Sequence, residues 1–411
     1  MIFEKIKLGD VSKVSSSKRI FAKQYVEKGI PFYRQKEIID KKNKVEITEP
    51  LFISTETYND IKSKFGVPQK GDLLITAVGV TLGIPYVVDD EVFYFKDGNL
   101  IWLRDFDEDI NSKYLYYWIT SDVGQKSMWS RTIGSAQPAL TIDTIKQFEV
   151  PIPTYEVQNK VVDILTAYDS LIEDNQKQIK LLEEAAQRLY KEWFVDLRFP
   201  GYEDVKIVDG VPEGWKKEPL SEVFTYVRGK SYTSKELVEN GGTLMVNLKN
   251  IRAFGGYNRN AEKRYSGKYK EEQKLNPGDL VMGVTDMTQE RRLVGHVAII
   301  PDIGETMTFS MDLIKLIPLS IQKSFLYATM YFGGYSKKIS PLANGVNVLH
   351  LKPEAMMNME MLIPTKEVMD QYDVIFDTYQ KKIETLQKQF DFAAEARNRL
   401  LPKLMSGEIE V

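Results

Sequence analysis

The chain of 411 residues contains no cysteine and only two histidines, His296 and His350. The missing cysteines exclude a disulfide framework, an iron–sulfur cluster, a thiol nucleophile and a cysteine-based zinc site. Two histidines are too few for a multi-histidine metal centre. The first ten residues lack the apolar core of a signal peptide, and no run of about 18 apolar residues occurs. We therefore expect a soluble, cytoplasmic protein with roughly two to four domains.

A strong charge of one sign is also absent, because 55 basic residues face 58 acidic ones and the net charge is −3. A uniformly basic surface for nucleic acid is thereby excluded, but the average hides two basic segments. Residues 13–44 form the first basic segment and residues 228–270 the second, and each holds ten basic and three acidic side chains. Aromatic residues are interleaved in both. Each segment is a candidate surface for phosphates.

The chain aligns with itself after a shift of about 211 residues. The aligned pairs include Leu8 with Leu220, Gly71 with Gly278, Arg34 with Asn247, Lys36 with Lys249, Ile164 with Ile375, and Arg188 with Arg399. An ordered series of matches over the whole length indicates an internal duplication, and its period is too long for a solenoid. The duplication predicts a two-lobed molecule.

Each half changes character in its last third. Short apolar runs bounded by glycine, proline and aspartate predict strands, turns and some helix in residues 1–150 and 212–361. Residues 155–196 contain neither proline nor glycine, residues 366–406 contain only Pro402, and both segments are rich in strong helix formers. The sequence therefore predicts two mixed lobes and two long helices.

Apolar residues in both helical segments follow a heptad, which includes Val161 and Leu171 in the first segment. A neighbouring apolar stripe, which includes Leu165 and Ala186, widens the apolar face. We expect the two helices to pack antiparallel as a coiled coil, because a pseudo-two-fold repeat lets each seam bury the other. Asn175 interrupts the first seam, either as a register-setting polar layer or as a partner contact. Residues expected in the spacer or in partner docking are Asn175, Ile179, Leu182, Trp193, Phe194, Leu386, Phe390 and Leu404.

These patterns predict an α+β fold, in which two similar mixed α/β lobes are joined by two long antiparallel helices and related by a pseudo-two-fold internal repeat. Lobe 1 comprises residues 1–153, and lobe 2 comprises residues 201–364 with a linker at about 201–215. Residues 154–200 form a central helical spacer, and residues 365–411 form a C-terminal one.

This order of segments resembles the specificity subunits of type I restriction-modification systems over the whole chain. The motifs that carry the resemblance are Gly71-Asp-Leu-Leu74, Pro277-Gly-Asp-Leu-Val281, Glu149-Val-Pro-Ile-Pro153, Glu360-Met-Leu-Ile-Pro364, Arg188-Leu-Tyr-Lys-Glu-Trp-Phe194, Val211-Pro-Glu-Gly-Trp215 and Arg399-Leu-Leu-Pro-Lys-Leu-Met-Ser-Gly-Glu408. No single motif is diagnostic, but their ordered duplication is specific.

The resemblance implies a non-catalytic reader of double-stranded DNA. Each lobe would be a target recognition domain for one half of an asymmetric bipartite site. The helices would space the lobes and dock two methyltransferase subunits, and two motor-nuclease subunits would join for cleavage. S-adenosylmethionine, Mg²⁺ and ATP are then expected in the partner subunits, with no cofactor in this chain and no membrane partner.

Within each lobe, lysine and arginine would contact phosphates, while arginine, asparagine and glutamine can pair with base edges. We expect base readers first in residues 34–36 and their counterparts 247–250, then in two late loops at 134–137 and 344–347. For the aromatic residues, base stacking and core packing both remain open. The candidate DNA contacts are Lys13, Lys18, Arg19, Arg34, Gln35, Lys36, Lys41, Lys42, Gln137, Arg228, Lys230, Tyr232, Asn247, Lys249, Asn250, Arg252, Arg259, Arg264, Asn344 and Asn347.

The chain lacks the motifs of catalysis on DNA. The nearest string to an amino-methyltransferase loop, Asn276-Pro-Gly-Asp279, has neither the second proline nor the aromatic residue. Gly229-Lys-Ser231 would need glycine where Phe224 stands to form a phosphate-binding loop. Two other hypotheses remain, a self-sufficient enzyme and a protein-binding coiled-coil scaffold or antirestriction-type inhibitor. The two basic segments argue against the inhibitor, whose lobes should be acidic.

Overall fold

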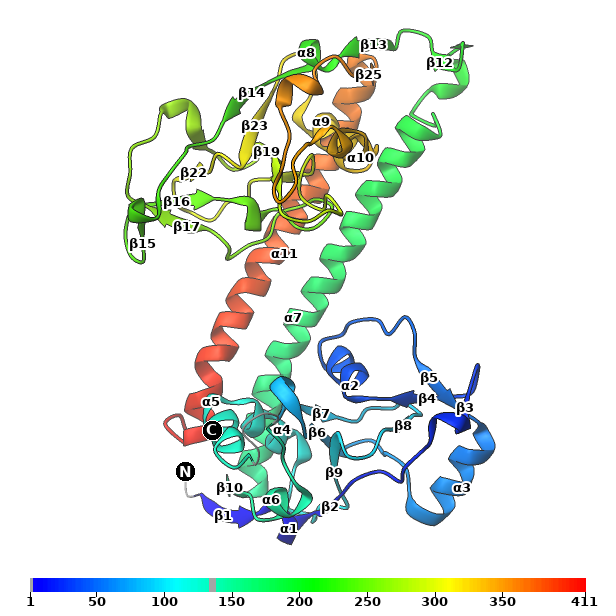
Figure 1. Cartoon of the computed structure of the whole chain (residues 1–411), viewed down its shortest axis with the longest axis vertical. Helices are drawn as coiled ribbons and strands as arrows, with labels where there is room; N and C mark the ends of the chain where they lie inside the picture. Colours follow the sequence, from blue (N-terminus) through cyan, green and yellow to red (C-terminus); the bar gives the residue numbers. More distant parts are fainter. Residues whose placement is uncertain (1–2, 133–137) are drawn as a thin grey trace. The chain divides into compact units, whose positions relative to one another are not determined.

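The computed structural model describes residues 3–132 and 138–411, and it divides into two compact units (Figure 1). The first unit is Met1–Glu173 with Phe390–Val411, and the second is Asp174–Gln389. Each unit therefore combines one lobe with a segment of each long helix. Among the described residues, no helix is both long and apolar enough to cross a membrane.

The first unit contains two small sheets and a strand pair that closes the lobe. Strands β1 (Glu4–Lys7) and β10 (Glu149–Ile152) pair antiparallel, so the start and the end of lobe 1 are neighbours. One sheet has the order β2 (Lys13–Ser15), β9 (Leu100–Arg104), β6 (Leu73–Thr76), β7 (Pro85–Val87). The other has the order β3 (Tyr25–Val26), β5 (Leu51–Ile53), β4 (Ile30–Tyr33), β8 (Tyr94–Phe95). The helices are α1 (Leu8–Val11), α2 (Gln35–Lys42), α3 (Thr55–Phe65), α4 (Ser112–Thr120), α5 (Asp122–Trp129) and α6 (Ile142–Lys146).

The second unit repeats this topology. Strands β13 (Lys216–Pro219) and β25 (Glu360–Ile363) form the closing pair. The two sheets are β14 (Phe224–Arg228), β23 (Leu313–Pro318), β19 (Leu280–Gly283), β21 (Val297–Ile299), and β15 (Leu237–Val238), β17 (Lys263–Tyr265), β16 (Thr243–Val246), β22 (Met307–Phe309), β18 (Lys274–Leu275). Smaller elements are α8 (Leu220–Val223), α9 (Lys323–Tyr331), α10 (Tyr335–Ile339) and the pairs β11 (Ile207–Val208) with β12 (Val211–Pro212) and β20 (Thr285–Asp286) with β24 (Leu349–His350).

The duplication extends to single hydrogen bonds. The backbone N–H of Leu140 donates to the carbonyl of Ala77 at 2.8 Å in lobe 1, and Leu351 donates to Val284 at 2.8 Å in lobe 2. In both lobes the second sheet contains one parallel pair, β4 with β8 and β16 with β22. The internal repeat and the α+β fold class predicted from the sequence are thus confirmed.

Strand β6 explains how each lobe builds its core. Side chains along a strand alternate between its two faces. Leu73 and Ile75 therefore pack with the helix α4 on one side, whereas Leu74 packs with Phe95 on the other. All four residues of β6 are buried, as are all four of β19, its counterpart in lobe 2. A strand that is apolar on both faces fixes a three-layer lobe of helix, sheet and second sheet.

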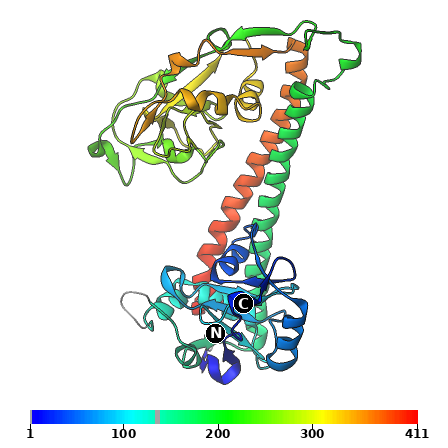
Figure 2. The ribbon, with the colours of Figure 1, turned by 45° about the vertical axis from the view of Figure 1, so that its right-hand side comes forward.

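The long helices are α7 (Tyr155–Tyr190), which continues as the π-helical turn η3 (Lys191–Val195), and α11 (Lys366–Ser406). Within each unit their segments lie side by side and run in opposite directions (Figures 1 and 2). In the first unit Arg397 donates to Asp169 at 2.9 Å, and Leu165 shares a buried cluster with Leu404. In the second unit the ring of Trp193 lies 5.9 Å from that of Tyr372.

The buried face of α7 differs in detail from the expected heptad. Leu171, an expected seam residue, is 45% exposed, whereas Leu165 and Ala186 from the neighbouring stripe are buried. The reason is that α7 has two partners, because the lobe covers it in addition to α11. Val161 and Leu165 pack in the same cluster as residues of α4, so the buried face is turned toward the lobe. A sequence heptad describes only a helix with one partner.

Candidate nucleic-acid interface

The start of lobe 1's candidate DNA surface is helix α2, which we call the contact element of lobe 1. At its first residue, the Gln35 amide donates to the Val78 carbonyl at 2.9 Å and to the Thr81 hydroxyl at 2.8 Å. Val78 and Thr81 belong to the loop 77–83, which follows β6. In the same loop, the Gly79 N–H donates to the Pro138 carbonyl at 3.0 Å. The contact element, the loop after β6 and Pro138, which follows the late loop in the sequence, therefore meet at one place. The candidate Gln137 lies outside the described residues.

Lobe 2 builds the same three-part surface from different residues. Its contact element is the 3₁₀ turn η6 (Leu248–Asn250), whose Leu248 packs in a cluster with Leu293. The loop 284–293 follows β19 as the loop 77–83 follows β6. Its Gln289 amide donates to the Val346 carbonyl of the late loop at 2.9 Å. The late-loop candidates Asn344 and Asn347 are both exposed.

Lys36 and Lys249 occupy equivalent positions on the two contact elements, and both are exposed. Neither forms an ion pair with any described residue, although carboxylates are plentiful in both lobes. Lys13, Lys18 and Lys230 likewise form no ion pair within the described part of the chain. An unpaired, exposed ammonium is ready to meet a phosphate without first breaking an internal bond. These lysines are the sequence candidates that the structure leaves most available.

Every described arginine among the candidates, by contrast, is paired with a carboxylate. The pairs are Arg19 with Asp97, Arg34 with Glu37, Arg228 with Glu354, Arg252 with Glu183, Arg259 with Glu384, and Arg264 with Glu305. Among the lysines, only Lys41 is held in this way, by Glu91 at 2.6 Å. Such an arginine can contact DNA only if a phosphate or a base replaces its carboxylate partner. Breaking the internal ion pair costs free energy, which reduces the net gain from the DNA contact.

Two of the pairs change the pKa of their carboxyl group. Burial would raise the pKa of Glu37, but hydrogen bonds from the Arg34 side chain and backbone lower it. The Tyr226 hydroxyl, with Arg228, lowers the pKa of Glu354 to about 2. Both carboxylates are therefore ionised at neutral pH and keep their arginines bound.

Two expected base readers point inward. Asn247 is 4% exposed and its amide donates to the Ala261 carbonyl at 2.7 Å. Asn250 is fully buried and donates to the Asn258 carbonyl at 3.0 Å. Both side chains stabilise the turn around Lys249 and leave no free amide for a base edge. We therefore correct their role from base contact to support of the contact element.

Lys42 and Tyr232 are also less accessible than a phosphate or base contact needs. Burial and the nearby charge of Arg397 lower the pKa of Lys42, whose ammonium lies 5.9 Å from the centre of the Tyr116 ring. The Tyr232 hydroxyl accepts a hydrogen bond from Lys263 at 2.7 Å. Other aromatic residues of the basic segments, such as Phe32 and Tyr265, are buried in the lobe cores, while Phe21 and Phe254 are exposed.

The expected spacer residues divide by depth. Asn175, Trp193, Leu386 and Leu404 are buried, whereas Ile179, Leu182, Phe194 and Phe390 are partly buried. The Asn175 amide nitrogen has no hydrogen-bond partner among the described residues. Trp193 and Phe194 pack with Tyr372 beneath lobe 2, so they belong to the core of the second unit.

Sequence reasoning missed the loop 284–293. It contains Gln289, Arg291 and Arg292 between β20 and β21, and the exposed Met287. Asp286 organises the loop by accepting from the backbone N–H groups of Thr288 at 2.8 Å and Leu293 at 2.6 Å. The adjacent arginines were a usable signal, but they lie outside the second basic segment. Only the fold brings them beside the late loop.

The described residues contain no cluster of three metal-ligating side chains. His296 is 3% exposed, lies immediately before β21 and packs edge-on against the ring of Phe254, so it is a buried residue rather than the strand residue that the sequence indicated or a solvent-facing base.

The model of the type I restriction modification DNA specificity domain matches this chain twice, at residues 2–184 and 212–401. The chain belongs to the family of type I restriction-modification specificity subunits. As a specificity subunit it is a recognition component and not a catalytic one. The two matches coincide with the two halves of the internal repeat, so each half is one domain of the family.

Relatives and solved structures agree with this assignment. The specificity subunit of the type I restriction enzyme MjaIX from Methanocaldococcus jannaschii is 27% identical over 311 residues, which cover 73% of this chain and 69% of that protein. The MjaVIII specificity subunit of the same organism is 24% identical over 92% of this chain and 91% of its own length. The S subunit structure from M. genitalium has a TM-score of 0.66 at 14% identity, over 98% of this chain and 96% of that one, and so shares the fold.

Proposed function

We propose that this specificity subunit reads a bipartite, asymmetric site on double-stranded DNA, with one lobe for each half-site. The observation that carries the proposal is the three-part surface, which is built twice with an exposed lysine at the equivalent position of each contact element. Because the surrounding residues differ between the lobes, the two half-sites should differ in sequence. Lysines then supply phosphate contacts, and the late loops and the loop 284–293 supply base contacts.

The length of the helices would then set the number of unread base pairs. Two half-sites about one helical turn apart, near 34 to 36 Å, lie on the same face of the duplex. A helical spacer that fixes the separation of two readers also fixes the gap between their half-sites. Inserting four residues near Lys177, close to one helical turn, should change the gap and leave the recognised bases unchanged.

The proposal includes docking of two methyltransferase subunits on the solvent-facing sides of α7 and α11. Leu181 and Phe392 are exact counterparts in the repeat, and they are 63% and 70% exposed. The same side of each helix repeats three further residues, which are Gln178 with Gln389, Glu184 with Glu395, and Arg188 with Arg399. In both helices the glutamate pairs with the arginine one turn later. A similar exposed face on two helices suits two copies of one partner.

Motor-nuclease subunits would join the complex through the methyltransferases or through this chain. S-adenosylmethionine, Mg²⁺ and ATP would bind to those partners, because methyl transfer and ATP-dependent cleavage are their reactions. This chain would contribute position and sequence choice.

The proposal is tested with the complex captured through a tag on the full chain. It should select a two-part motif from a randomised duplex library, and its affinity should fall steeply with salt because phosphate contacts release counterions. Equal binding of all duplexes at physiological salt would contradict it and favour a protein-binding scaffold. Methyl transfer or cleavage by the pure chain alone would contradict its recognition-only role.

The docking face has a matched control in Leu171, which is exposed but aligns with Lys382 in the repeat. Leu181→Glu and Phe392→Glu should each remove one methyltransferase copy from the complex, measured by native mass. Leu171→Glu should retain both copies. If Leu181→Glu and Phe392→Glu each retained two methyltransferase copies, the proposed docking face would be wrong.

A further inference from the structure

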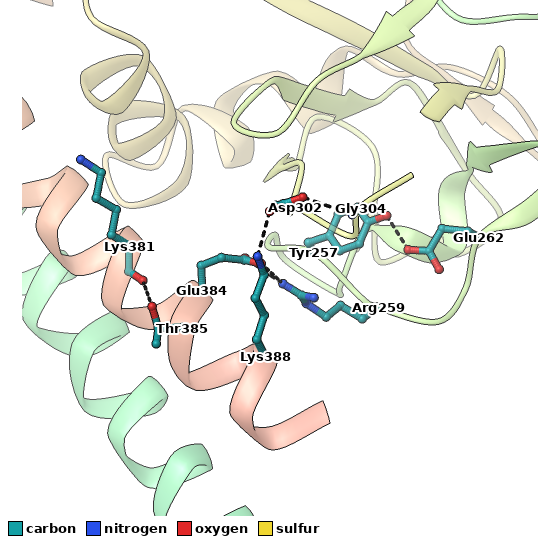
Figure 3. A network of polar contacts seen from close by, with 9 residues as sticks. All are labelled: Tyr257, Arg259, Glu262, Asp302, Gly304, Lys381, Glu384, Thr385 and Lys388. Carbon is teal, nitrogen blue, oxygen red and sulfur yellow. Dashed lines mark hydrogen bonds and ion pairs between the residues drawn. The ribbon is translucent and has the colours of Figure 1, made fainter. Parts of the chain in front are cut away.

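Two glutamates on the long helices hold basic residues of the lobes, and they are counterparts in the repeat. Glu384 of α11 accepts from one nitrogen of the Arg259 guanidinium with both carboxylate oxygens, at 2.9 and 2.7 Å (Figure 3). Glu173 of α7, 211 residues earlier, lies 3.6 Å from the ammonium of Lys44. Each pair lies within one unit, Glu384 in the second and Glu173 in the first. The same helical position therefore contacts the lobe in both halves.

In lobe 2, the ion pair of Glu384 is connected to the contact element through the backbone of Arg259 and Asn258 and the hydrogen bonds of Asn258. Arg259 follows Asn258, whose backbone N–H donates to the Asn250 carbonyl at 2.7 Å. The Asn258 amide also donates to the Lys249 carbonyl at 2.9 Å. Fixing Arg259 on the helix thus fixes the backbone that presents Lys249.

Two further ion pairs join lobe 2 to the long helices in the second unit. Lys388, one turn after Glu384, lies 2.8 Å from Asp302, and the hydrogen bond between them lowers the pKa of Asp302 and raises that of Lys388 (Figure 3). Arg252 lies 3.2 Å from Glu183 of α7. Arg259 is only 17% exposed, so its pair is shielded from solvent more than an ordinary surface pair.

In lobe 1, Lys44 is the second residue after the contact element, which ends at Lys42. Its backbone N–H donates to the Lys41 carbonyl at 3.1 Å, and Val45 donates to Asp40 at 2.8 Å, so Lys44 is held against the last turn of α2. Lys36 stands near the start of the same eight-residue helix. This contact is weaker than its counterpart, because it is longer and Lys44 is 68% exposed.

We propose that Glu173 and Glu384 are positioning residues, each of which sets where its lobe's contact element stands on the long helix and thereby sharpens the choice of bases in one half-site. The inference rests on the proposed function, because it concerns which half-site each lobe reads. In this proposal the two glutamates act through Lys44 and Arg259 and do not themselves contact DNA. The retention of one acid at the same position in both repeats, beside lobe segments of different sequence, distinguishes it from a chance surface pair.

The test measures the sequence preference of each half-site separately, with the tagged full chain in its captured complex. Glu384→Gln keeps the side-chain size and removes the charge. It should reduce the preference for the lobe 2 half-site at least about fivefold, the lower end of common coupling between sites, and leave the other half-site unchanged. Glu173→Gln should act on the lobe 1 half-site only, and by less. The double variant Arg259→Glu with Glu384→Arg should restore the lobe 2 preference.

Glu156→Gln is the matched control, since Glu156 forms an exposed pair with Lys160 one turn along α7. It should change neither half-site. Wild-type preference in both half-sites after Glu384→Gln, or equal loss in both, would overturn the inference, and so would failure of the charge swap to restore preference. A wild-type complex without any two-part motif would instead overturn the proposed function, and the inference with it.

Discussion

Lobe 1 and lobe 2 share their strand order and the backbone hydrogen bonds of their central strands, but they differ in the contact element that each presents. In lobe 1 it is the eight-residue helix α2, and an ion pair between Arg34 and Glu37 lies at its N-terminus. In lobe 2 it is the three-residue turn η6, supported by the buried Asn247 and Asn250. The buried strands tolerate little change, because a core is closely packed. The comparison shows that the residues that build the core of each lobe are separate from those that form its contact element.

The lobes also differ in how their charges are balanced. In lobe 2, Arg252 and Arg259 pair with glutamates of the long helices, whereas in lobe 1 Arg19 and Arg34 pair with acids of the same lobe. The contact element of lobe 2 is therefore held to the helices more firmly than that of lobe 1. Four predictions break or sharpen this comparison.

The largest expected effect is on the two central strands. Leu74→Ala should lower the free energy of unfolding by about 2 to 5 kcal/mol, because a fully buried side chain leaves a cavity. Val281→Ala, at the equivalent position, should lower it less because fewer buried carbon atoms are removed. Hydrogen exchange, measured segment by segment, should show increased opening mainly in the mutated lobe. Equal opening in both lobes would show that the two units unfold together.

Asn247→Ala and Arg34→Ala test whether the two contact elements are supported differently. Asn247→Ala removes the donor to Ala261 and the acceptor for the Lys249 N–H, and should destabilise lobe 2 by about 1 to 3 kcal/mol. Arg34→Ala, at the aligned position of lobe 1, removes a half-exposed side chain and should have a smaller effect. Thermal unfolding measures both. A larger loss for Arg34→Ala would contradict the supporting role of Asn247.

Lys36→Ala and Lys249→Ala compare the two exposed lysines. Each variant should weaken DNA binding for all sequences and reduce the slope of log affinity against log salt by about 0.9, the value for one lost phosphate contact. Lys160→Ala serves as a control, because Lys160 lies on α7 outside the candidate DNA surface and its ammonium is 3.2 Å from Glu156. Unchanged salt slopes for both variants would remove these lysines from the DNA surface.

The smallest effect concerns pH and only lobe 2, since both histidines of the chain lie there. Burial lowers the pKa of His296, so the folded lobe holds a neutral ring while the unfolded chain binds a proton below about pH 6.5. The free energy of unfolding of the second unit should therefore fall as the pH drops below that value, by at most about 1.4 kcal/mol per pH unit. His296→Gln should remove this part of the pH dependence in thermal unfolding. The same slope in the variant would assign it to other groups.

Much of the fold followed from the sequence because a duplication supplies its own comparison. The pairing of Gly71 with Gly278 and of Arg188 with Arg399 identified two lobes and two helices without any relative. The burial of α7 did not follow, since Leu171 and Leu165 fit a helix equally well until the position of the lobe is known. A single sequence cannot show which face of a helix a lobe covers.

The candidate site followed only in outline. Lys36 and Lys249 are exposed on equivalent elements, as their alignment suggested. The pairing of Arg259 with Glu384 could not be foreseen, because 125 residues separate them. Asn247 and Asn250 have the side chains of base readers, but their inward hydrogen bonds depend on a loop that only the folded lobe creates.

The closing strand pairs have an evolutionary consequence. Because β1 lies beside β10, and β13 beside β25, each lobe leaves and rejoins the rest of the chain at one seam. Antiparallel pairing depends mainly on backbone groups, so the seam accepts a different insert with little adjustment. If each lobe reads one half-site as proposed, genetic recombination at that seam would replace one lobe in a single step and change one half of the recognition site.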